Sequence, residues 1–146
     1  RVMSIISRYV PDVEIYSIDE AFIKFDGFSE DETNEKCRDI IKTILKWTGI
    51  PVSIGLAPTK SLAKVANRIA KKYSTRTNGF YSINNNEKRI KALKNISAGD
   101  IWGIGFQNEK KLPNSARDSP ANMEGTRTCK PRQAPCLANA CFGDGR

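Results

Sequence analysis

The stretch VEIYSIDEAFIKF, residues 13–25, is rich in β-branched and aromatic residues, yet it carries two adjacent acids near its middle. Segments of this composition form strands. One continuous strand would send Asp19 and Glu20 to opposite faces, and a buried, unpaired carboxylate is costly. A hairpin that turns there would bring both acids to one edge, within reach of water or a metal ion. We therefore predict two strands that meet near Asp19 and Glu20.

Regular patterns continue on the C-terminal side of this hairpin. A helix is predicted up to Thr48, because apolar residues recur at helical spacing from Cys37, Thr33 or Asn34 can cap its start, and Gly49 can end it. The further predictions are a buried strand in IPVSIGLA (residues 50–57), a helix opened by Thr59, a turn and short strand in NGFYSI (residues 78–83) and a helix in NEKRIKALKNI (residues 86–96).

Together these elements predict an α+β fold in which helices cover a mainly antiparallel sheet. Beyond Phe106 the sequence has no sustained period and many Gly, Pro, Ser and Asn residues. Such composition predicts a poorly ordered segment.

The composition limits the classes of protein and of site. A chain of 146 residues, 39% hydrophobic and 27% charged, is typical of a soluble globular domain with a real core. No apolar run approaches the roughly 20 residues of a membrane-spanning helix, and the N-terminal residues lack the regions of a signal peptide, so we expect a cytoplasmic protein. The chain has no histidine, which excludes Ser-His-Asp and Cys-His pairs and His-ligated metals.

The four cysteines do not predict a metal centre or a disulfide framework. Cys37 falls on the apolar face of a predicted helix and is expected in the core. Cys129, Cys136 and Cys141 follow a C-x6-C-x4-C spacing without any C-x2-C pair, so we treat them as incidental. Any chemistry must therefore come from carboxylates, lysines and hydroxyls.

The net charge of +8 is unevenly distributed, with few acids between residues 34 and 95. Five basic residues recur at intervals of four from the start of the predicted helix after Thr59; this basic stripe is Lys60, Lys64, Arg68, Lys72 and Arg76. Like charges at that spacing destabilise an isolated helix by about 0.2–0.5 kcal/mol per pair. A polyanion such as nucleic acid would offset this cost, and an ordinary solvated basic face is the alternative.

Three roles are open to the two adjacent acids. A glycosidase pair fits poorly, because its carboxylates lie about 5 Å or more apart across the scissile bond. A divalent metal site fits better, because magnesium binds few carboxylates and is commonly shared with substrate phosphates. A structural turn is the third role. If Asp19 and Glu20 lie near the basic stripe, the two acids would supply anions for metal ions and the basic residues would supply cations for phosphates.

Three blocks in order carry a resemblance to a known family. YSIDEAF (residues 16–22), SIGLAPTKSLAKVANRIAKK (residues 53–72) and IWGIG (residues 101–105) resemble the Y-family of translesion DNA polymerases, in particular its UmuC type. The resemblance covers residues 1–105. It implies a partial palm over residues 1–78, the beginning of a thumb with a helix-hairpin-helix turn over residues 79–106, and an irregular tail over residues 107–146.

The resemblance also implies roles for individual residues. Asp19 and Glu20 would be the catalytic, magnesium-binding acids, and Lys60 would reach the incoming nucleotide's triphosphate. The residues implied in DNA binding are Lys64, Arg68, Gly103 and Gly105. The implied activity is error-prone synthesis past damaged bases during the SOS response. The implied ligands and partners are primer-template and damaged DNA, deoxynucleotide triphosphates, a UmuD-type accessory subunit, a recombinase and a sliding clamp.

The sequence departs from the family pattern at both ends. The family's first metal-binding aspartate segment and its fingers would precede Arg1, and the pattern is lost after Gly105. We therefore expect a remnant that is inactive alone, with a tail produced by a frameshift or an assembly artefact. Two alternatives are a non-catalytic, sequence-independent DNA-binding module and another palm-type phosphotransfer enzyme such as a cyclase.

Overall fold

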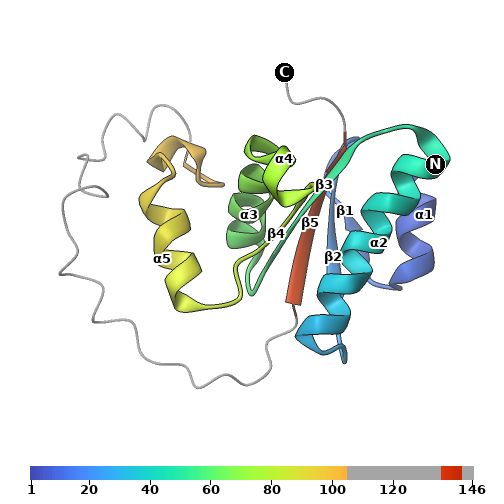
Figure 1. Cartoon of the computed structure of the whole chain (residues 1–146), viewed down its shortest axis with the longest axis horizontal. Helices are drawn as coiled ribbons and strands as arrows, with labels where there is room; N and C mark the ends of the chain where they lie inside the picture. The colour runs from blue at the N-terminus through green and yellow to red at the C-terminus, as the bar shows by residue number, and fades with distance from the viewer. Residues whose placement is uncertain (105–135, 143–146) are drawn as a thin grey trace.

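A five-stranded sheet lies between two layers of helices (Figure 1). The computed structural model describes residues 1–104 and 136–142. The strands are β1 (Val13–Ile15), β2 (Glu20–Phe25), β3 (Val52–Ala57), β4 (Phe80–Ser82) and β5 (Cys136–Phe142), and their order in the sheet is β1-β2-β5-β3-β4. The helices are α1 (Val2–Tyr9), α2 (Glu30–Thr48), α3 (Lys60–Lys72), α4 (Ser74–Thr77) and α5 (Asn86–Lys94), followed by the 3₁₀ turn η1 (Ala98–Asp100). Within the described residues, no helix is long and apolar enough to cross a membrane.

The predicted hairpin at Asp19 and Glu20 is confirmed. β1 and β2 pair antiparallel, with Ile15 opposite Ala21. The backbone N–H groups of Tyr16 and Ser17 both donate to the carbonyl of Glu20, at 3.0 Å each. The turn therefore leaves Asp19 in the connection and makes Glu20 the first residue of β2.

The α+β class is confirmed, but the sheet is mixed. β1, β2, β5 and β3 pair antiparallel in turn, whereas β4 runs parallel to β3. The connection between these two parallel strands contains α3, and a helical crossover is what a parallel pair requires. The predicted strand in residues 78–83 is thus an edge strand of the same sheet.

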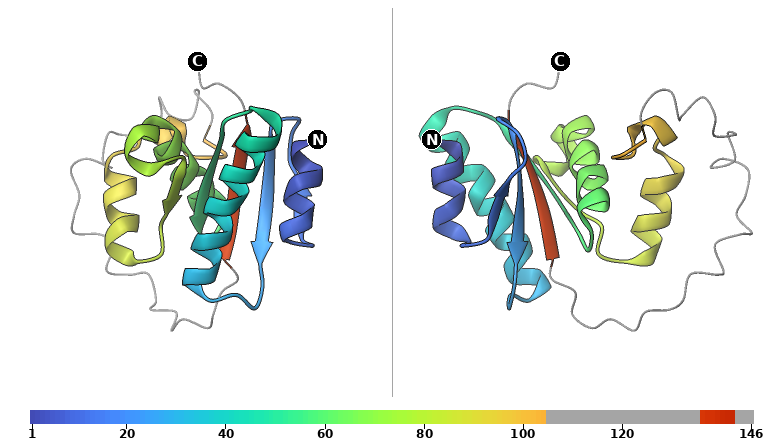
Figure 2. Two further views of the ribbon diagram at one scale, coloured as in Figure 1. Left: turned by 45° about the vertical axis from the view of Figure 1, so that its right-hand side comes forward. Right: turned by 180° about the vertical axis from the view of Figure 1, so that it is seen from behind.

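The expectation of an irregular tail is wrong for β5, which lies between β2 and β3 (Figure 2). Six residues of β5 pair with β2, from Cys136 opposite Phe25 to Cys141 opposite Glu20, and six pair with β3. A central strand satisfies its backbone groups on both sides, so a segment without local strand signals can still be ordered. The rest of the tail, residues 107–135 and 143–146, lies outside the described residues.

One face of the sheet packs against α1 and α2 and is aliphatic. Every second strand residue points into this layer, as the strand period requires. The buried residues of this cluster are Ile5, Ile6, Val10, Ile23, Phe25, Cys37, Ile40, Ile44, Val52, Ile54, Leu56, Phe80, Ala138, Ala140 and Phe142. The predicted core position of Cys37 is confirmed, and burial raises the pKa of its thiol well above the ordinary value.

The caps of α2 differ in part from the prediction. Gly49 ends the helix in the left-handed conformation as expected, with φ of 71°. The start is four residues earlier than Thr33 suggested, because Ser29 is the N-cap and forms a capping box with Glu32. The hydroxyl of Thr33 instead donates to the Ser29 carbonyl at 2.8 Å.

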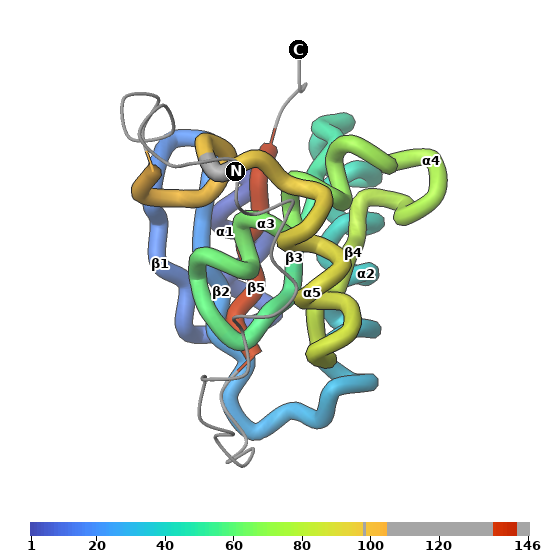
Figure 3. Tube along the Cα trace, turned by 90° about the vertical axis from the view of Figure 1, so that its left-hand side faces the viewer, coloured from blue at the N-terminus to red at the C-terminus, as the bar shows by residue number. Residues whose placement is uncertain are grey.

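The other face of the sheet packs against α3, and α5 lies beside α3 in the same layer (Figure 3). The side chains at this contact are small, and Thr59 caps α3 as predicted. A Cβ atom at Gly55 would lie 2.0 Å from the backbone nitrogen of Asn67, which shows how closely β3 and α3 approach. The second buried cluster comprises Ala57, Ala63, Val65, Ala66, Ile83 and Ala92.

Candidate carboxylate and lysine site

Asp19 lies in the hairpin turn and is exposed. The hydroxyl of Ser17 donates to Asp19 Oδ1 at 2.5 Å, and this hydrogen bond is the main reason that the pKa of the Asp19 carboxyl is below its ordinary value. The backbone N–H of Phe142 donates to the Asp19 carbonyl at 2.9 Å. The turn is thereby fixed to the end of β5, with the Asp19 carboxylate open to solvent.

Glu20 is in a different environment, although it is the next residue. Its side chain is 17% exposed and lies on the α3 side of the sheet. Oε2 accepts from Lys64 Nζ at 3.1 Å, and Oε1 accepts from Asn139 Nδ2 at 3.0 Å. Both carboxylate oxygens therefore already have partners, one from α3 and one from β5.

The Lys64 ammonium is surrounded by aromatic rings. Its Nζ lies 4.0 Å from the ring centroid of Tyr16, 4.7 Å from that of Trp102 and 5.7 Å from that of Phe22. The Trp102 indole donates to the Tyr16 hydroxyl at 3.2 Å. A cation at these distances is attracted to the faces of the rings. The turn after η1 is thus tied to the hairpin through Lys64, Tyr16 and Trp102.

Lys60 belongs to a separate ion pair. Its Nζ lies 2.5 Å from Glu14 Oε2, on β1, and 5.1 Å from the ring centroid of Phe22. This pair is exposed, and exposed pairs contribute little to stability. The structure therefore brings Lys64, but not Lys60, into contact with Glu20.

The basic stripe is shorter than predicted and is partly neutralised by the chain itself. α3 ends at Lys72, and Arg76 lies in α4. Arg68 Nη2 lies 2.5 Å from Asp100 Oδ1. Three of the five basic residues therefore have acid partners on β1, β2 and η1. These ion pairs could not be predicted from the sequence, because each partner acid lies in another element, 32 to 46 residues away along the chain.

The glycines of IWGIG are described only in part. Gly103 has φ of 93°, in the region that favours glycine, and no atom lies within 4 Å of a Cβ built there. Gly105 lies outside the described residues, so its predicted role remains a prediction. The helix-hairpin-helix turn likewise remains a prediction, because the described part ends at Ile104 and does not resume until Cys136.

The two acids, as arranged, do not form a magnesium site. Magnesium requires near-octahedral oxygen ligands and is commonly held by one or two carboxylates. Both Glu20 oxygens accept hydrogen bonds, one of them from the Lys64 ammonium, whereas the Asp19 carboxylate is exposed and accepts from Ser17. Among residues 1–104 and 136–142, no group of three or more His, Cys, Asp or Glu side chains could hold a metal ion.

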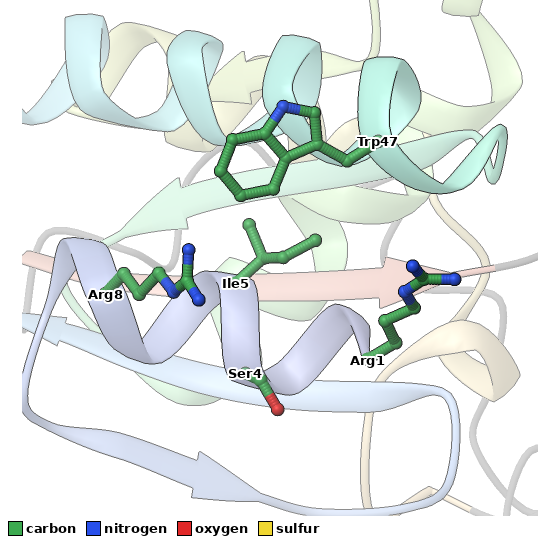
Figure 4. A pocket seen from close by; sticks show the side chains of 5 residues that line it. All are labelled: Arg1, Ser4, Ile5, Arg8 and Trp47. Carbon is green, nitrogen blue, oxygen red and sulfur yellow. The ribbon is translucent and has the colours of Figure 1, made fainter.

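Two cavities lie at the surface of the described residues, and one of them adjoins this site. A cleft of about 460 Å³ lies between α1 and the end of α2, lined by Arg1, Ser4, Ile5, Arg8 and Trp47 (Figure 4). It lies on the aliphatic side of the sheet and contains none of the predicted site residues. A cavity of about 290 Å³ is lined by Glu14, Phe22 and Lys60, among others, and therefore adjoins the candidate site.

Sequence reasoning missed five residues of this cluster: Tyr16, Phe22, Asn67, Trp102 and Asn139. The three aromatic residues lie inside the quoted blocks, so their proximity to Lys64 could have been suspected. Asn67 is buried on α3 and donates through Nδ2 to Asn139 Oδ1 at 2.7 Å. No sequence signal pointed to Asn139, because it lies in the segment predicted to be irregular.

Comparison with known proteins supports the resemblance. Residues 1–68 match the impB/mucB/samB family. The chain is 42% identical over 113 residues to "Protein UmuC" of Salmonella typhimurium and 34% identical over 117 residues to "Protein ImpB" of the same species, in each case over 77% of this chain and 27% of the relative. It is 41% identical over 112 residues to "DNA polymerase IV" of Picrophilus torridus, over 77% of this chain and 30% of that protein. No solved structure matches the chain.

Proposed function

Because this chain belongs to the impB/mucB/samB family, which its residues 1–68 match, we propose that it contributes a palm surface to a translesion DNA polymerase and contacts DNA phosphates. The chain spans about 27–30% of the length of the relatives compared above. The observation that carries the proposal is that β2 presents Glu20 to α3, the helix with the basic stripe, at a Lys64 Nζ to Glu20 Oε2 distance of 3.1 Å. The cations of a lysine-rich helix can bind the phosphates of a substrate, and the carboxylates beside the helix can bind metal ions that accompany those phosphates.

Within this proposal the residues have distinct roles. Lys60 is assigned to the nucleotide triphosphate, because its ion pair with Glu14 is exposed and can exchange for a phosphate. Lys64, Arg68, Gly103 and Gly105 are assigned to the DNA backbone, and Arg68 is the most accessible of the paired cations, with its side chain 57% exposed. Contacts of this kind position DNA without reading its sequence.

The proposal is tested by the salt dependence of duplex DNA binding by the 146-residue chain and its Arg68→Gln variant. Each phosphate contact that is lost reduces the slope of log affinity against log salt by about 0.9. We expect Arg68→Gln to lower the slope by one such contact on every duplex sequence. Lys42→Gln is the matched control, because it removes the same charge from an exposed position on α2, across the sheet. Equal effects of the two changes would contradict a DNA surface on α3.

The same experiment bears on the alternative of a non-catalytic DNA-binding module, which predicts the same salt slope. Primer extension separates the two, because only a polymerase couples binding to template-directed nucleotide addition. That the chain alone does not extend a primer remains a prediction. So do the magnesium requirement, the damaged-DNA preference and the binding of an accessory subunit, a recombinase or a clamp.

A further inference from the structure

The cleft between α1 and the end of α2 has no part in the candidate site, yet it combines arginines with an exposed aromatic ring. Its volume is about 460 Å³, and its lining is Arg1, Ser4, Ile5, Arg8 and Trp47 (Figure 4). The two helices cover the face of the sheet opposite to α3 (Figure 1). A ligand in this cleft would therefore be recognised by a second surface, separate from the residues proposed to contact DNA.

Trp47 and Ile5 give the cleft an apolar floor. Ile5 is 5% exposed, belongs to the aliphatic core and points from α1 toward the Trp47 ring (Figure 4). Trp47, in the last turn of α2, is 52% exposed. Exposed apolar surface with a polar rim marks places where another molecule binds, and tryptophan and arginine are enriched among the residues that contribute most to such binding.

Two arginines flank this apolar floor. Arg1 lies at the start of α1 and Arg8 in its last turn, and Ile5 lies between them (Figure 4). Neither arginine forms an ion pair with an acid of the described residues. At a rise of 1.5 Å per residue, the helix separates them by about 10 Å along its axis. An extended peptide covers that distance with about three residues.

The segments around the cleft contribute charge of one sign. Residues 1–11, which contain α1, and residues 40–56, which contain the end of α2, include no acid. They include four basic residues, and all four are exposed: Arg1, Arg8, Lys42 and Lys46. Charge of this kind favours and orients an acidic partner.

We propose that this cleft binds a short acidic segment of another protein, with an apolar side chain packed on Trp47 and Ile5 and with carboxylates on either side paired to Arg1 and Arg8. Arginine binds a carboxylate through two parallel hydrogen bonds. The guanidinium carbon of Arg8 lies 5.7 Å from the centroid of the Trp47 ring. Arg8 can keep this stacked position while it binds a carboxylate, whereas a nucleic-acid base that stacks on the same face of the ring would have to displace it.

The test measures binding of a synthetic peptide to the 146-residue chain by fluorescence anisotropy, without DNA. The probe is a fluorescein-labelled octapeptide with a Leu-Phe pair between two Asp-Asp pairs and a glycine at each end. One control peptide has Ser-Ser in place of Leu-Phe, and the other has asparagine in place of every aspartate. We expect the probe to bind saturably and each control to bind about tenfold more weakly, because each lacks one of the two recognised features. No saturable binding of the probe, or equal affinity for the probe and either control, would overturn the proposal.

Substitutions on the protein test whether the peptide binds in this cleft. We expect Trp47→Ala to weaken binding of the probe about tenfold and Arg8→Gln about fivefold. Arg76→Gln is the matched control, because it removes the same charge from an exposed position on α4. Equal effects of Arg8→Gln and Arg76→Gln would show attraction to net charge alone and would overturn the proposal.

Single-stranded DNA is the competing ligand, and oligothymidylate is titrated into the same variants. We expect Trp47→Ala to leave its affinity unchanged. If Trp47→Ala weakened oligothymidylate binding as much as it weakened peptide binding, the cleft would be a single-stranded DNA site and the proposal would fail.

A measurement on the wild-type chain decides the matter if a variant fails to fold. The phenylalanine of the probe is replaced by benzoylphenylalanine, the complex is irradiated, and the cross-linked residues are identified by mass spectrometry. We expect cross-links to α1 and to residues 42–50, and we expect excess unlabelled probe to suppress them. Cross-links mainly to α3 or α4 would overturn the proposal.

Discussion

The two faces of the sheet are built differently, although the same strands form both. On the side of α1 and α2, large apolar residues such as Ile40 and Ile54 are fully buried in one cluster. On the side of α3, alanine and glycine allow a close approach, and the buried residues include Asn67 and Asn139. The first face resembles the interior of any stable domain, whereas the second places charged and amide groups at defined positions.

The face toward α1 and α2 therefore contributes mainly to stability, whereas the face toward α3 holds the groups of the candidate site. Burial of apolar surface is worth about 25 cal/mol per Å² and does not depend on direction, so the aliphatic face tolerates modest rearrangement. Hydrogen bonds to Glu20 and Asn139 depend on position, and a buried group that loses its partner costs about 1–3 kcal/mol. The α3 face is therefore expected to be the more sensitive to a change of shape and the less sensitive to a loss of volume.

The largest loss of stability is expected at Gly55, where β3 and α3 approach each other most closely. Gly55→Ala adds one carbon that would lie 2.0 Å from Asn67 N and 2.4 Å from Ala63 O, both backbone atoms that cannot rotate away. The helix must move off the sheet, so we expect a loss of more than about 4 kcal/mol, in the range reserved for severe core changes. Chemical denaturation followed by circular dichroism measures it. Wild-type stability in Gly55→Ala would contradict the close approach of α3 to β3.

The adjacent residue on β3 gives the matching experiment on the aliphatic face. Ile54→Ala removes three carbons from a fully buried side chain and leaves a cavity, for which we expect a loss of about 2–4 kcal/mol. Because α3 is not disturbed, the emission of Trp102 in the folded protein, measured in a Trp47→Phe background since Trp47 also emits, should remain unchanged by Ile54→Ala. A change of Trp102 emission in Ile54→Ala would show that the two faces are coupled.

The same contrast explains which parts of the fold were predictable. β2, β3 and α3 carry their own signals, namely β-branched runs, a cap at Thr59 and apolar residues at helical spacing. α1 was not predicted, although Ile5 and Ile6 are buried at positions that an amphipathic helix would give them. β5 could not be predicted, because its order depends on pairing with β2 and β3 and its sequence, CLANACF, places a polar residue at the centre.

The candidate site was predictable as a set of residues but not as a set of contacts. Asp19, Glu20 and Lys64 were selected from their spacing and from the resemblance. Their partners were not, because Trp102 and Asn139 reach the site from elements 38 and 75 residues beyond Lys64. The sequence therefore indicates which groups carry charge, and only the three-dimensional arrangement shows which charges are already neutralised.

The smallest effect on stability is expected from a change at Ser17, in the exposed hairpin turn. This change tests whether the exposed Asp19 carboxylate behaves independently of the enclosed Glu20 carboxylate. The Ser17 hydroxyl is the main cause of the lowered pKa of Asp19, so Ser17→Ala should raise that pKa toward the ordinary value of 3.8. A carboxyl whose pKa is lowered in the folded state stabilises the fold above its unfolded pKa, and this contribution disappears as the pH falls through the folded pKa. The effect of Ser17→Ala on unfolding should therefore be present above about pH 4 and should disappear as the pH falls through the lowered pKa of Asp19.

Carbon-detected NMR titration of the Asp19 carboxyl measures this pKa directly, and Ser7→Ala is the control, because the Ser7 hydroxyl donates to the Met3 carbonyl on α1 and touches no acid. We expect Ser17→Ala to shift the Asp19 titration upward and Ser7→Ala to leave it in place. Reductive methylation followed by mass spectrometry reports how accessible Lys64 is. Since Ser17 hydrogen-bonds Asp19 and not Glu20, the rate at which Lys64 is methylated should be the same in both variants. If Ser17→Ala also exposed Lys64, the turn and the enclosed pair would form a single unit, and the distinction between an open Asp19 and a held Glu20 would fail.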